Sequence, residues 1–260
     1  MPNSLNPAPA LKKSVRAQAH LRFLGSNTAA RCAQHWPAAH LVSMYHGKYS
    51  ITYKISKRGP PMQTRLPTEE RQAEIVAAAL HLARDTSPLS ITTSDIARAV
   101  GVSQGAVFKH FATKEAIWVA AMQWVRAHLL AQLQASAVGA ATGVLALEAV
   151  FQAHVDFVIA HPGVPRVIFQ ELQQPLDSPV KQEVRALLQA YRLLLLQQFQ
   201  RGMQAGELPA GLDPEAAATL FVGIVQGLVM QSMLSGRPAA MQAQAGAVFA
   251  IYLRGIRAAA

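Results

Sequence analysis

The stretch DIARAVGVSQGAVFKHFATKEAIW, residues 95–118, contains two short helical patterns separated by a break of three residues. We expect Thr92 or Thr93 to cap a first helix over 94–100, which ends at Gly101 because glycine tolerates a left-handed backbone. Ser103 then caps a second helix over 104–110. A helix that stops at glycine and restarts through a serine cap is typical of a helix-turn-helix.

The side chains of this unit separate into an inward apolar set and an outward set. Ala97 is small enough to let the second helix cross the first closely. The inward set is Ile96, Val100, Val102, Val107 and Phe111. The outward set is Gln104, Gly105, Ala106, Phe108, Lys109 and His110. Such an outward face fits the major groove of DNA, and the alternative is a solvated polar face.

Residues 68–118 resemble the DNA-binding domain of the TetR family of bacterial regulators, through the string ITTSDIARAVGVSQGAVFKHFATKEAIW. The resemblance implies an Ω-shaped homodimer, usually a repressor that a small molecule releases from its operator. It also implies that Thr93 and Lys114 contact phosphate and that the outward face contacts bases or backbone. The DNA-binding set is therefore Thr93, Ser103, Gln104, Gly105, Ala106, Phe108, Lys109, His110 and Lys114.

Two positions depart from the family pattern. The family commonly has tyrosine at the position of Phe108, and some relatives have a basic residue at the position of Ser94. Phe108 retains the packing and can contact a thymine methyl group, but it lacks the hydroxyl that would bind phosphate. Both departures predict weaker binding to the DNA backbone.

The rest of the chain predicts an all-α fold. Of its 260 residues 51% are hydrophobic, Ala, Leu and Gln dominate, and runs of β-branched residues are few. A helix from Thr68 to near Asp85 precedes the motif, and a helix capped by Thr113 follows it to about residue 136. The further helices are predicted over 144–160, 162–173, 178–205, 213–235 and 239–257, with prolines at their joints.

The net charge of +10 resides entirely in the first quarter of the chain. Residues 1–66 contain ten Lys or Arg and no acidic residue, whereas 67–260 contain 14 of each sign. We expect 1–66 to be a disordered basic extension, or sequence outside the working protein with translation starting at Met62. The predicted domains are then this extension, a DNA-binding domain over 67–118 and an effector-binding and dimerisation domain over 119–260.

Two helices near the C-terminus, over 213–235 and 239–257, are predicted to form a four-helix bundle with a second copy. The first is too apolar for a solvated face, and glycines four residues apart allow close approach. The predicted dimer interface contains Leu220, Phe221, Gly223, Ile224, Gly227 and Leu228. The alternatives are packing within one chain and a membrane span over 216–236, which its Gln and Ser side chains make costly. A symmetric dimer predicts a palindromic operator.

An effector pocket is predicted among the large side chains of the central helices, and its apolar lining suits a hydrophobic effector. The candidates are Trp118, Met122, Phe151, His154, Phe157, Phe169 and Tyr191; the alternative is ordinary core packing. His154, Asp156, His161 and Glu171 lack the spacing of a metal site. The sequence shows neither a glycine-rich phosphate loop nor a Ser-His-carboxylate set. We therefore expect no metal, no cofactor and no enzyme.

Together these features predict a regulator in the cytoplasm, where a chain with the single cysteine Cys32 fits the reducing conditions. Its expected partners are operator DNA, a small effector and a second copy, with no membrane. One rival is a dimeric scaffold protein on the same fold with weak or no operator binding. Another is nonspecific DNA binding through residues 1–66, which salt dependence would distinguish.

Overall fold

The computed structural model describes residues 42–46, 49–53 and 67–257, with side chains placed in 67–257. The chain divides into two units, Met1–Gln63 and Thr64–Ala260. In the first unit, strands β1 (Val42–His46) and β2 (Tyr49–Tyr53) pair antiparallel, with Val42 opposite Tyr53. The sequence predicts no regular structure before residue 67, so this ribbon differs from the expectation. Cys32, Met62 and the ten basic residues of 1–66 lie outside the described residues.

The second unit begins with the helices predicted around the motif. They are α2 (Thr68–Leu82), α3 (Thr93–Val100), α4 (Gln104–Phe108) and α5 (Lys114–Val138). Ile96 and Val107 are fully buried and Phe111 nearly so, while Val100 and Val102 are half-buried against the same core. The inward set is thus confirmed. Helix α4 ends two residues earlier than predicted.

Local capping explains where these helices start and stop. The Thr92 hydroxyl accepts a hydrogen bond from the Asp95 amide at 3.1 Å, and the Asp95 carboxylate accepts one from the Thr92 amide at 3.0 Å. This capping box makes Thr92 the N-cap of α3. Gly101 ends the helix with φ 77°, in the left-handed region. Ser103 and Thr113 cap α4 and α5 as predicted.

Five more helices complete the second unit, each within one residue of its predicted bounds. They are α6 (Gly143–Ala160), α7 (Gly163–Leu172), α8 (Pro179–Gln204), α9 (Pro214–Ser235) and α10 (Pro238–Arg257). Within residues 67–257 every regular element is helical, which confirms the all-α prediction for this part of the chain.

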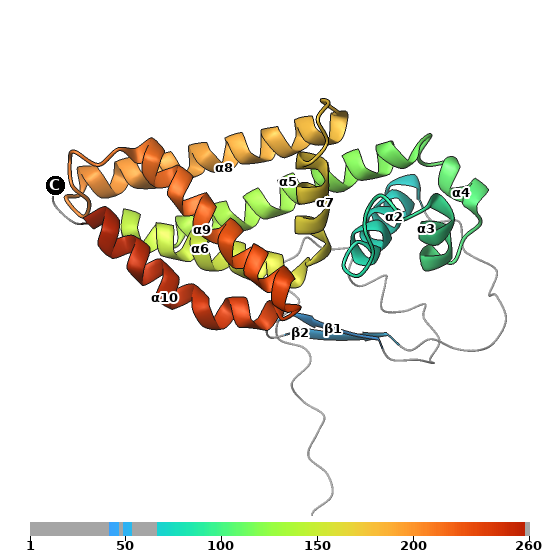
Figure 1. The fold of residues 1–260 in the computed structure, drawn as a ribbon, viewed down its shortest axis with the longest axis horizontal. Helices are drawn as coiled ribbons and strands as arrows, with labels where there is room; N and C mark the ends of the chain where they lie inside the picture. Colours follow the sequence, from blue (N-terminus) through green and yellow to red (C-terminus); the bar gives the residue numbers. More distant parts are fainter. Residues whose placement is uncertain (1–41, 47–48, 54–66, 258–260) are drawn as a thin grey trace, which may run out of the picture. The chain divides into compact units, whose positions relative to one another are not determined.

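This unit has two parts, the DNA-binding domain with α2 to α4 and a helical body with α6 to α10. Helix α5 joins them, because it packs against α2 near its start and against α6 and α8 farther along (Figure 1). Helices α9 and α10 pair with each other and pack on α6. An aromatic cluster fills the space between them, with the rings of Phe151 and Phe221 5.5 Å apart and those of Phe221 and Tyr252 5.7 Å apart. Phe221 is therefore a core residue of its own chain.

Two helices, α6 and α9, are long and apolar enough to cross a membrane by length and composition alone. Half of the apolar window of α6 is buried within the protein, which is typical of a core helix. In α9 the buried share is 33%, although its mean hydropathy is 1.6. Much of the apolar surface of α9 thus remains uncovered in one chain.

Candidate DNA-binding surface and adjoining groove

Helix α4 presents the outward residues that the sequence predicted. Gln104, Gly105 and Lys109 are exposed, Ala106 and His110 are half-buried, and the Phe108 ring is 46% exposed. Gln104 and Phe108 are four residues apart, so they lie on the same face of the helix. The surface combines an amide, an apolar ring and a cation, which can read base edges and bind phosphate.

Thr93 lies differently from what the resemblance implies. Its side chain belongs to the first turn of α3 and the residue is only 9% exposed. The Gln104 Nε2 atom donates a hydrogen bond to the Thr93 hydroxyl at 2.7 Å. The structure thus joins two residues of the predicted DNA-binding set to each other across the turn.

Lys114 is also engaged inside the protein. Its Nζ atom donates to the carbonyl oxygen of Leu89 at 2.8 Å, and burial lowers the pKa of the lysine. The partner is 25 residues away, so the spacing of the motif gave no sign of it. This bond ties the start of α5 to the loop before α3, and it competes with the phosphate contact that the family resemblance implies.

The cations of the DNA-binding domain are mostly neutralised by neighbours. The ion pairs are Arg71 with Glu74, Arg84 with Asp85, and Arg98 with Asp95. Lys109 is exposed and forms no ion pair with any described residue. Lys109, which directly follows the last residue of α4, is therefore the cation on this surface that is best placed to bind a phosphate.

His110 connects the end of α4 to α2. Its backbone carbonyl accepts a hydrogen bond from Gln72 Nε2 at 3.2 Å. Its Nδ1 atom is buried and has no hydrogen-bond partner within residues 67–257. The ring is thus partly a packing element, and the contact from Gln72 is one that sequence reasoning missed.

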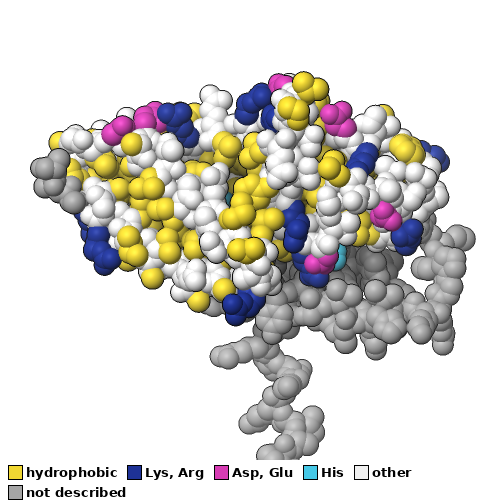
Figure 2. Space-filling model, in the orientation of Figure 1, with side chains coloured by type: hydrophobic (Ala, Val, Ile, Leu, Met, Phe, Trp, Pro, Cys, Tyr) yellow, Lys and Arg dark blue, Asp and Glu magenta, His cyan; other side chains and the backbone are white. Residues whose placement is uncertain are grey.

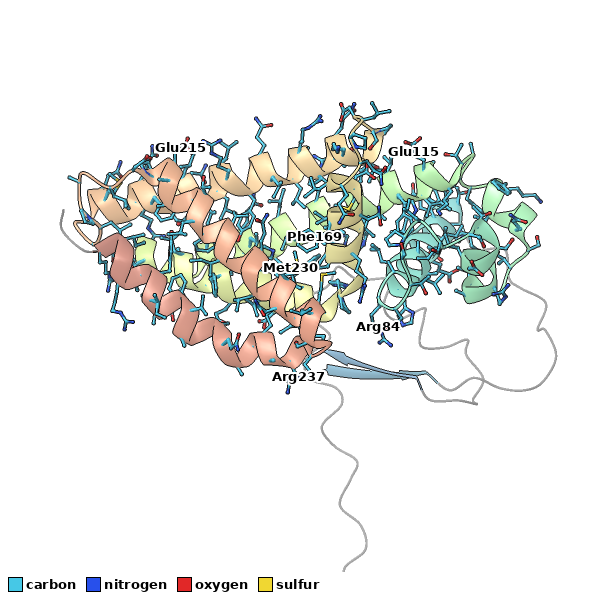
Figure 3. All side chains as sticks on the ribbon, viewed as in Figure 1. Arg84, Glu115, Phe169, Glu215, Met230 and Arg237 are labelled. Carbon is cyan, nitrogen blue, oxygen red and sulfur yellow. The ribbon has the colours of Figure 1, made fainter. Side chains whose placement is uncertain are left out.

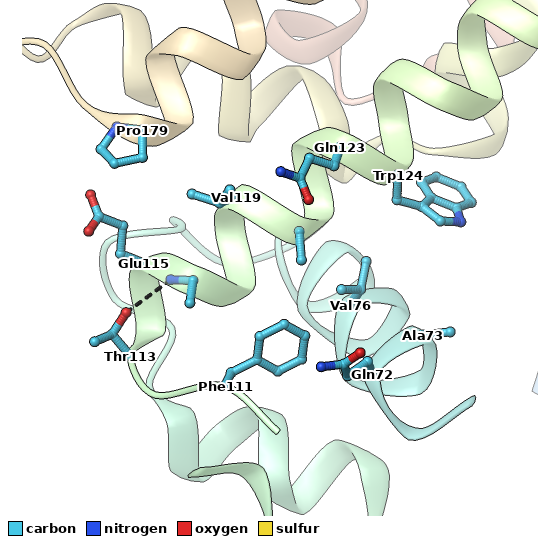
Figure 4. Close-up of a pocket in the computed structure, with 12 residues that line it drawn as sticks. Gln72, Ala73, Val76, Phe111, Thr113, Glu115, Val119, Gln123, Trp124 and Pro179 are labelled. Atoms are coloured by element: carbon cyan, nitrogen blue, oxygen red, sulfur yellow. Dashed lines mark hydrogen bonds between the residues drawn. The ribbon is translucent and has the colours of Figure 1, made fainter. Parts of the chain in front are cut away.

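A groove of about 590 Å³ lies between α2 and α5 (Figure 4). Its floor is mostly apolar, with Phe111 and Val76 facing Val119, while Glu115 lies near Pro179 at one end. The remaining lining residues are Gln72, Ala73, Thr113, Ala116, Ala120, Gln123 and Trp124. None of the seven predicted effector residues lines this groove.

The predicted effector residues instead lie mostly in the core of the helical body. Five of them are buried, namely Trp118, Met122, Phe151, Phe157 and Tyr191. Phe169 is half-buried on α7 (Figure 3). His154 on α6 is half-buried too, and its Nδ1 atom lies 3.1 Å from the Tyr191 hydroxyl. Burial lowers the pKa of His154 to about 4 and raises that of Tyr191.

The predicted dimer residues on α9 divide between two faces. Phe221 and Leu228 are buried in the core of their own chain, whereas Leu220, Gly223 and Gly227 are exposed and Ile224 is half-buried. Two further exposed apolar side chains extend this side: Met230, which Figure 3 labels, and Leu234. Figure 2 shows hydrophobic side chains gathered over this region. We call Leu220, Gly223, Gly227, Met230 and Leu234 the α9 stripe.

No group of three His, Cys, Asp or Glu side chains that could hold a metal occurs in the part of the chain that the structure describes. Asp156 is exposed on α6, away from the half-buried His154. The titratable groups of the helical body therefore offer no assembled metal site among the described residues.

Two family models match the chain. The model described as bacterial regulatory proteins, tetR family, matches residues 75–121. The model described as tetracyclin repressor-like, C-terminal domain, matches residues 170–248. The first covers the helix-turn-helix and its flanking helices, and the second covers most of α8 to α10.

Curated relatives and a solved structure resemble this chain at low sequence identity. The nucleoid occlusion factor SlmA of Glaesserella parasuis is 26% identical over 171 residues, covering 64% of this chain and 83% of the relative. The fatty acid metabolism regulator protein of Bacillus subtilis is 22% identical, covering 70% and 94%. The crystal structure of FadR from Bacillus subtilis in complex with stearoyl-CoA matches with a TM-score of 0.64 at 22% identity, covering 71% and 98%.

Proposed function

We propose that this chain, which belongs to the TetR family of bacterial regulatory proteins, is a repressor that binds a palindromic operator as a dimer. Membership makes it a DNA-binding regulator, and the repressor role and the operator symmetry are the proposal. The observation that carries it is the exposed face of α4, held on a capped helix-turn-helix with a buried core. Such a unit can enter the major groove while the rest of the domain contacts the backbone.

The α9 stripe supports dimerisation. Leu220 is 54% and Leu234 83% exposed on one side of a helix whose other side is core. Ile251, on the paired helix α10, adds a further exposed apolar side chain. Glycines within the stripe let a second helix approach closely, since they carry no side chain. A two-fold axis through this face would pair α9 and α10 with their copies.

A small hydrophobic effector is the proposed signal. Large apolar side chains pack between α5, α6 and α8, and the His154–Tyr191 pair is a polar contact among them. A structural neighbour, FadR, was solved with stearoyl-CoA, a ligand with a long apolar chain. Release from DNA requires that the effector bind the DNA-free state more tightly than the DNA-bound state. Helix α5 contacts both parts of the unit and could transmit that preference.

Fluorescence anisotropy with the full chain tests the proposal. The probe is the DNA upstream of its own gene, compared with a scrambled duplex of equal length at two salt concentrations. We expect a preference of roughly a thousandfold for the native sequence, which is typical of specific regulators. Equal and weak binding to both duplexes would contradict operator-specific binding at that promoter.

A second candidate is a dimeric scaffold protein on the same fold with weak or no operator binding. The internal bond of Lys114 and the absence of a hydroxyl on Phe108 favour it, because both reduce contact with phosphate. In this case the chain would remain a dimer in solution but select no sequence from DNA. Loss of DNA binding on deletion of residues 1–66, with no sequence preference beforehand, would instead indicate binding through the basic residues of this extension.

A further inference from the structure

The hydrogen bond between Gln104 and Thr93 joins the two helices of the helix-turn-helix by their side chains. Its length is 2.7 Å, and it spans eleven positions of the sequence. It is separate from the capping contacts, because Thr92 caps α3 and Ser103 caps α4. Because Thr92 and Ser103 already cap the two helices, the bond between Gln104 and Thr93 is not needed for capping. Its effect is to fix the direction of the Gln104 amide.

While it is bonded to Thr93, the Gln104 amide still has a donor and an acceptor with which it can contact a base. One hydrogen of Nε2 is used by Thr93, and within residues 67–257 no further hydrogen bond involves the second hydrogen or Oε1. An exposed amide that offers one donor and one acceptor side by side matches the N7 and N6 atoms of adenine in the major groove. A free glutamine would lose rotamer freedom on binding, which opposes affinity.

We propose that Thr93 is a positioning residue for Gln104, holding its amide so that it reads one A·T base pair in each operator half-site. The inference rests on the proposed function, because it requires sequence-specific DNA binding. It replaces the phosphate contact that the family resemblance implied for Thr93. Thr93 is only 9% exposed, so little of its side chain can reach a phosphate.

Selection from a randomised DNA duplex library, with the full 260-residue chain, tests the proposal because it reports the base preference at every position directly. The variants are Gln104→Ala, Thr93→Val and Thr93→Ser. Valine matches threonine in shape but has no hydroxyl, and serine retains the hydroxyl. Thr92 still caps α3 in both Thr93 variants, and thermal unfolding followed by circular dichroism verifies that each variant is folded.

The wild-type chain should select adenine at one position of each half-site. Gln104→Ala should flatten the preference at that position, because the reading group is removed. Thr93→Val should flatten the same position and leave the others unchanged, whereas Thr93→Ser should retain the preference. The loss of discrimination should be about fivefold to a hundredfold, as for a bidentate base contact.

A double-mutant cycle on the selected duplex separates positioning from a phosphate contact. If Thr93 acts through Gln104, Thr93→Val should change little in a chain that already carries Gln104→Ala. If Thr93 binds phosphate, Thr93→Val should weaken binding to every sequence by a similar factor, with or without Gln104. That second result, or a base preference unchanged by Thr93→Val, would overturn the inference.

The same selection experiment distinguishes failure of the proposed function from failure of the positioning role of Thr93. A wild-type chain that enriches no sequence from the library contradicts operator binding itself. A wild-type chain that enriches a palindrome whose preferences Thr93→Val leaves intact contradicts the positioning role alone.

Discussion

A Cβ atom added to Gly163 would lie 2.0 Å from the carbonyl oxygen of Leu80, so the start of α7 contacts the end of α2 at backbone distance. The same atom would lie 3.1 Å from the Arg84 amide nitrogen. Real Cβ atoms do not approach carbonyl oxygens so closely, and glycine is required at this contact. The contact gives the helical body a second connection to the DNA-binding domain, in addition to α5.

Gly163→Ala should therefore separate α7 from α2 and destabilise the protein. Both partners are backbone, which cannot turn aside as a flexible side chain can, so we expect a loss of about 1–3 kcal/mol in unfolding free energy. Chemical denaturation measures the loss, and hydrogen exchange should show faster exchange in α2. Gly139→Ala is the control, because position 139 has φ −75° and no atom within 4 Å of an added Cβ. Equal losses of stability from the two substitutions would contradict a requirement for glycine at the contact between α7 and α2.

Phe108→Tyr should strengthen DNA binding without changing its sequence preference. A hydroxyl on the exposed ring can donate to a phosphate, and a hydrogen bond to a charged group contributes roughly 1.5 kcal/mol, about tenfold in affinity. Anisotropy on selected and scrambled duplexes measures the effect, with Phe108→Leu as an apolar control. An unchanged affinity would show that the ring edge lies away from the DNA backbone.

The His154 side chain should make the protein less stable as the pH falls. Burial lowers its pKa to about 4, whereas the unfolded chain has the ordinary value near 6.5. Between these values the unfolded state binds more protons, so stability decreases as the pH falls from about 6.5 towards 4. At pH 5 this difference amounts to about 2 kcal/mol. Urea unfolding at pH 7.5 and pH 5 measures it.

The substitution His154→Gln should make that pH dependence shallower, whatever its effect on absolute stability. Tyr191→Phe is the matched control, because it removes the hydroxyl 3.1 Å from His154 Nδ1 and leaves the ring packed beside the histidine. Since burial is the cause of the low pKa, Tyr191→Phe should retain the pH dependence. A wild-type slope that survives in His154→Gln would assign it to other groups.

Charges placed on the α9 and α10 surface should separate the proposed dimer into monomers. Leu234 is 83% and Ile251 63% exposed, so Leu234→Glu and Ile251→Glu disturb no core of the single chain. Light scattering after size exclusion should show monomers for the double variant. Leu176→Glu is the control, because Leu176 is similarly exposed but lies between α7 and α8. A double variant that remains dimeric would place the interface elsewhere.

Local chemistry made much of this structure predictable. Thr92, Gly101, Ser103 and Thr113 act through bonds to residues within a few positions, so the sequence alone indicates where α3, α4 and α5 begin. Prolines at the joints of α8, α9 and α10 are equally local signals. The outward face of α4 follows from helix periodicity once those ends are known.

Contacts between distant residues were not predictable in the same way. The bonds from Gln104 to Thr93 and from Lys114 to Leu89 depend on how the helices cross, and helical spacing does not encode crossing. The same limit applies to α9, where Phe221 and Leu220 are adjacent and both apolar. Which of them faces the core depends on the positions of Phe151 and Tyr252, in other helices. The DNA-binding roles, the effector residues and the interface therefore remain predictions.

If the α9 stripe is the dimer interface, as proposed above, the amount of working regulator depends on gene expression in a nonlinear way. When two chains must meet to cover this stripe, the dimer concentration at low abundance rises with the square of the chain concentration. A cell that halves its synthesis of this protein would then lose about three quarters of the dimer. Occupancy of the operator would switch over a narrower range of synthesis rates than a monomeric regulator allows.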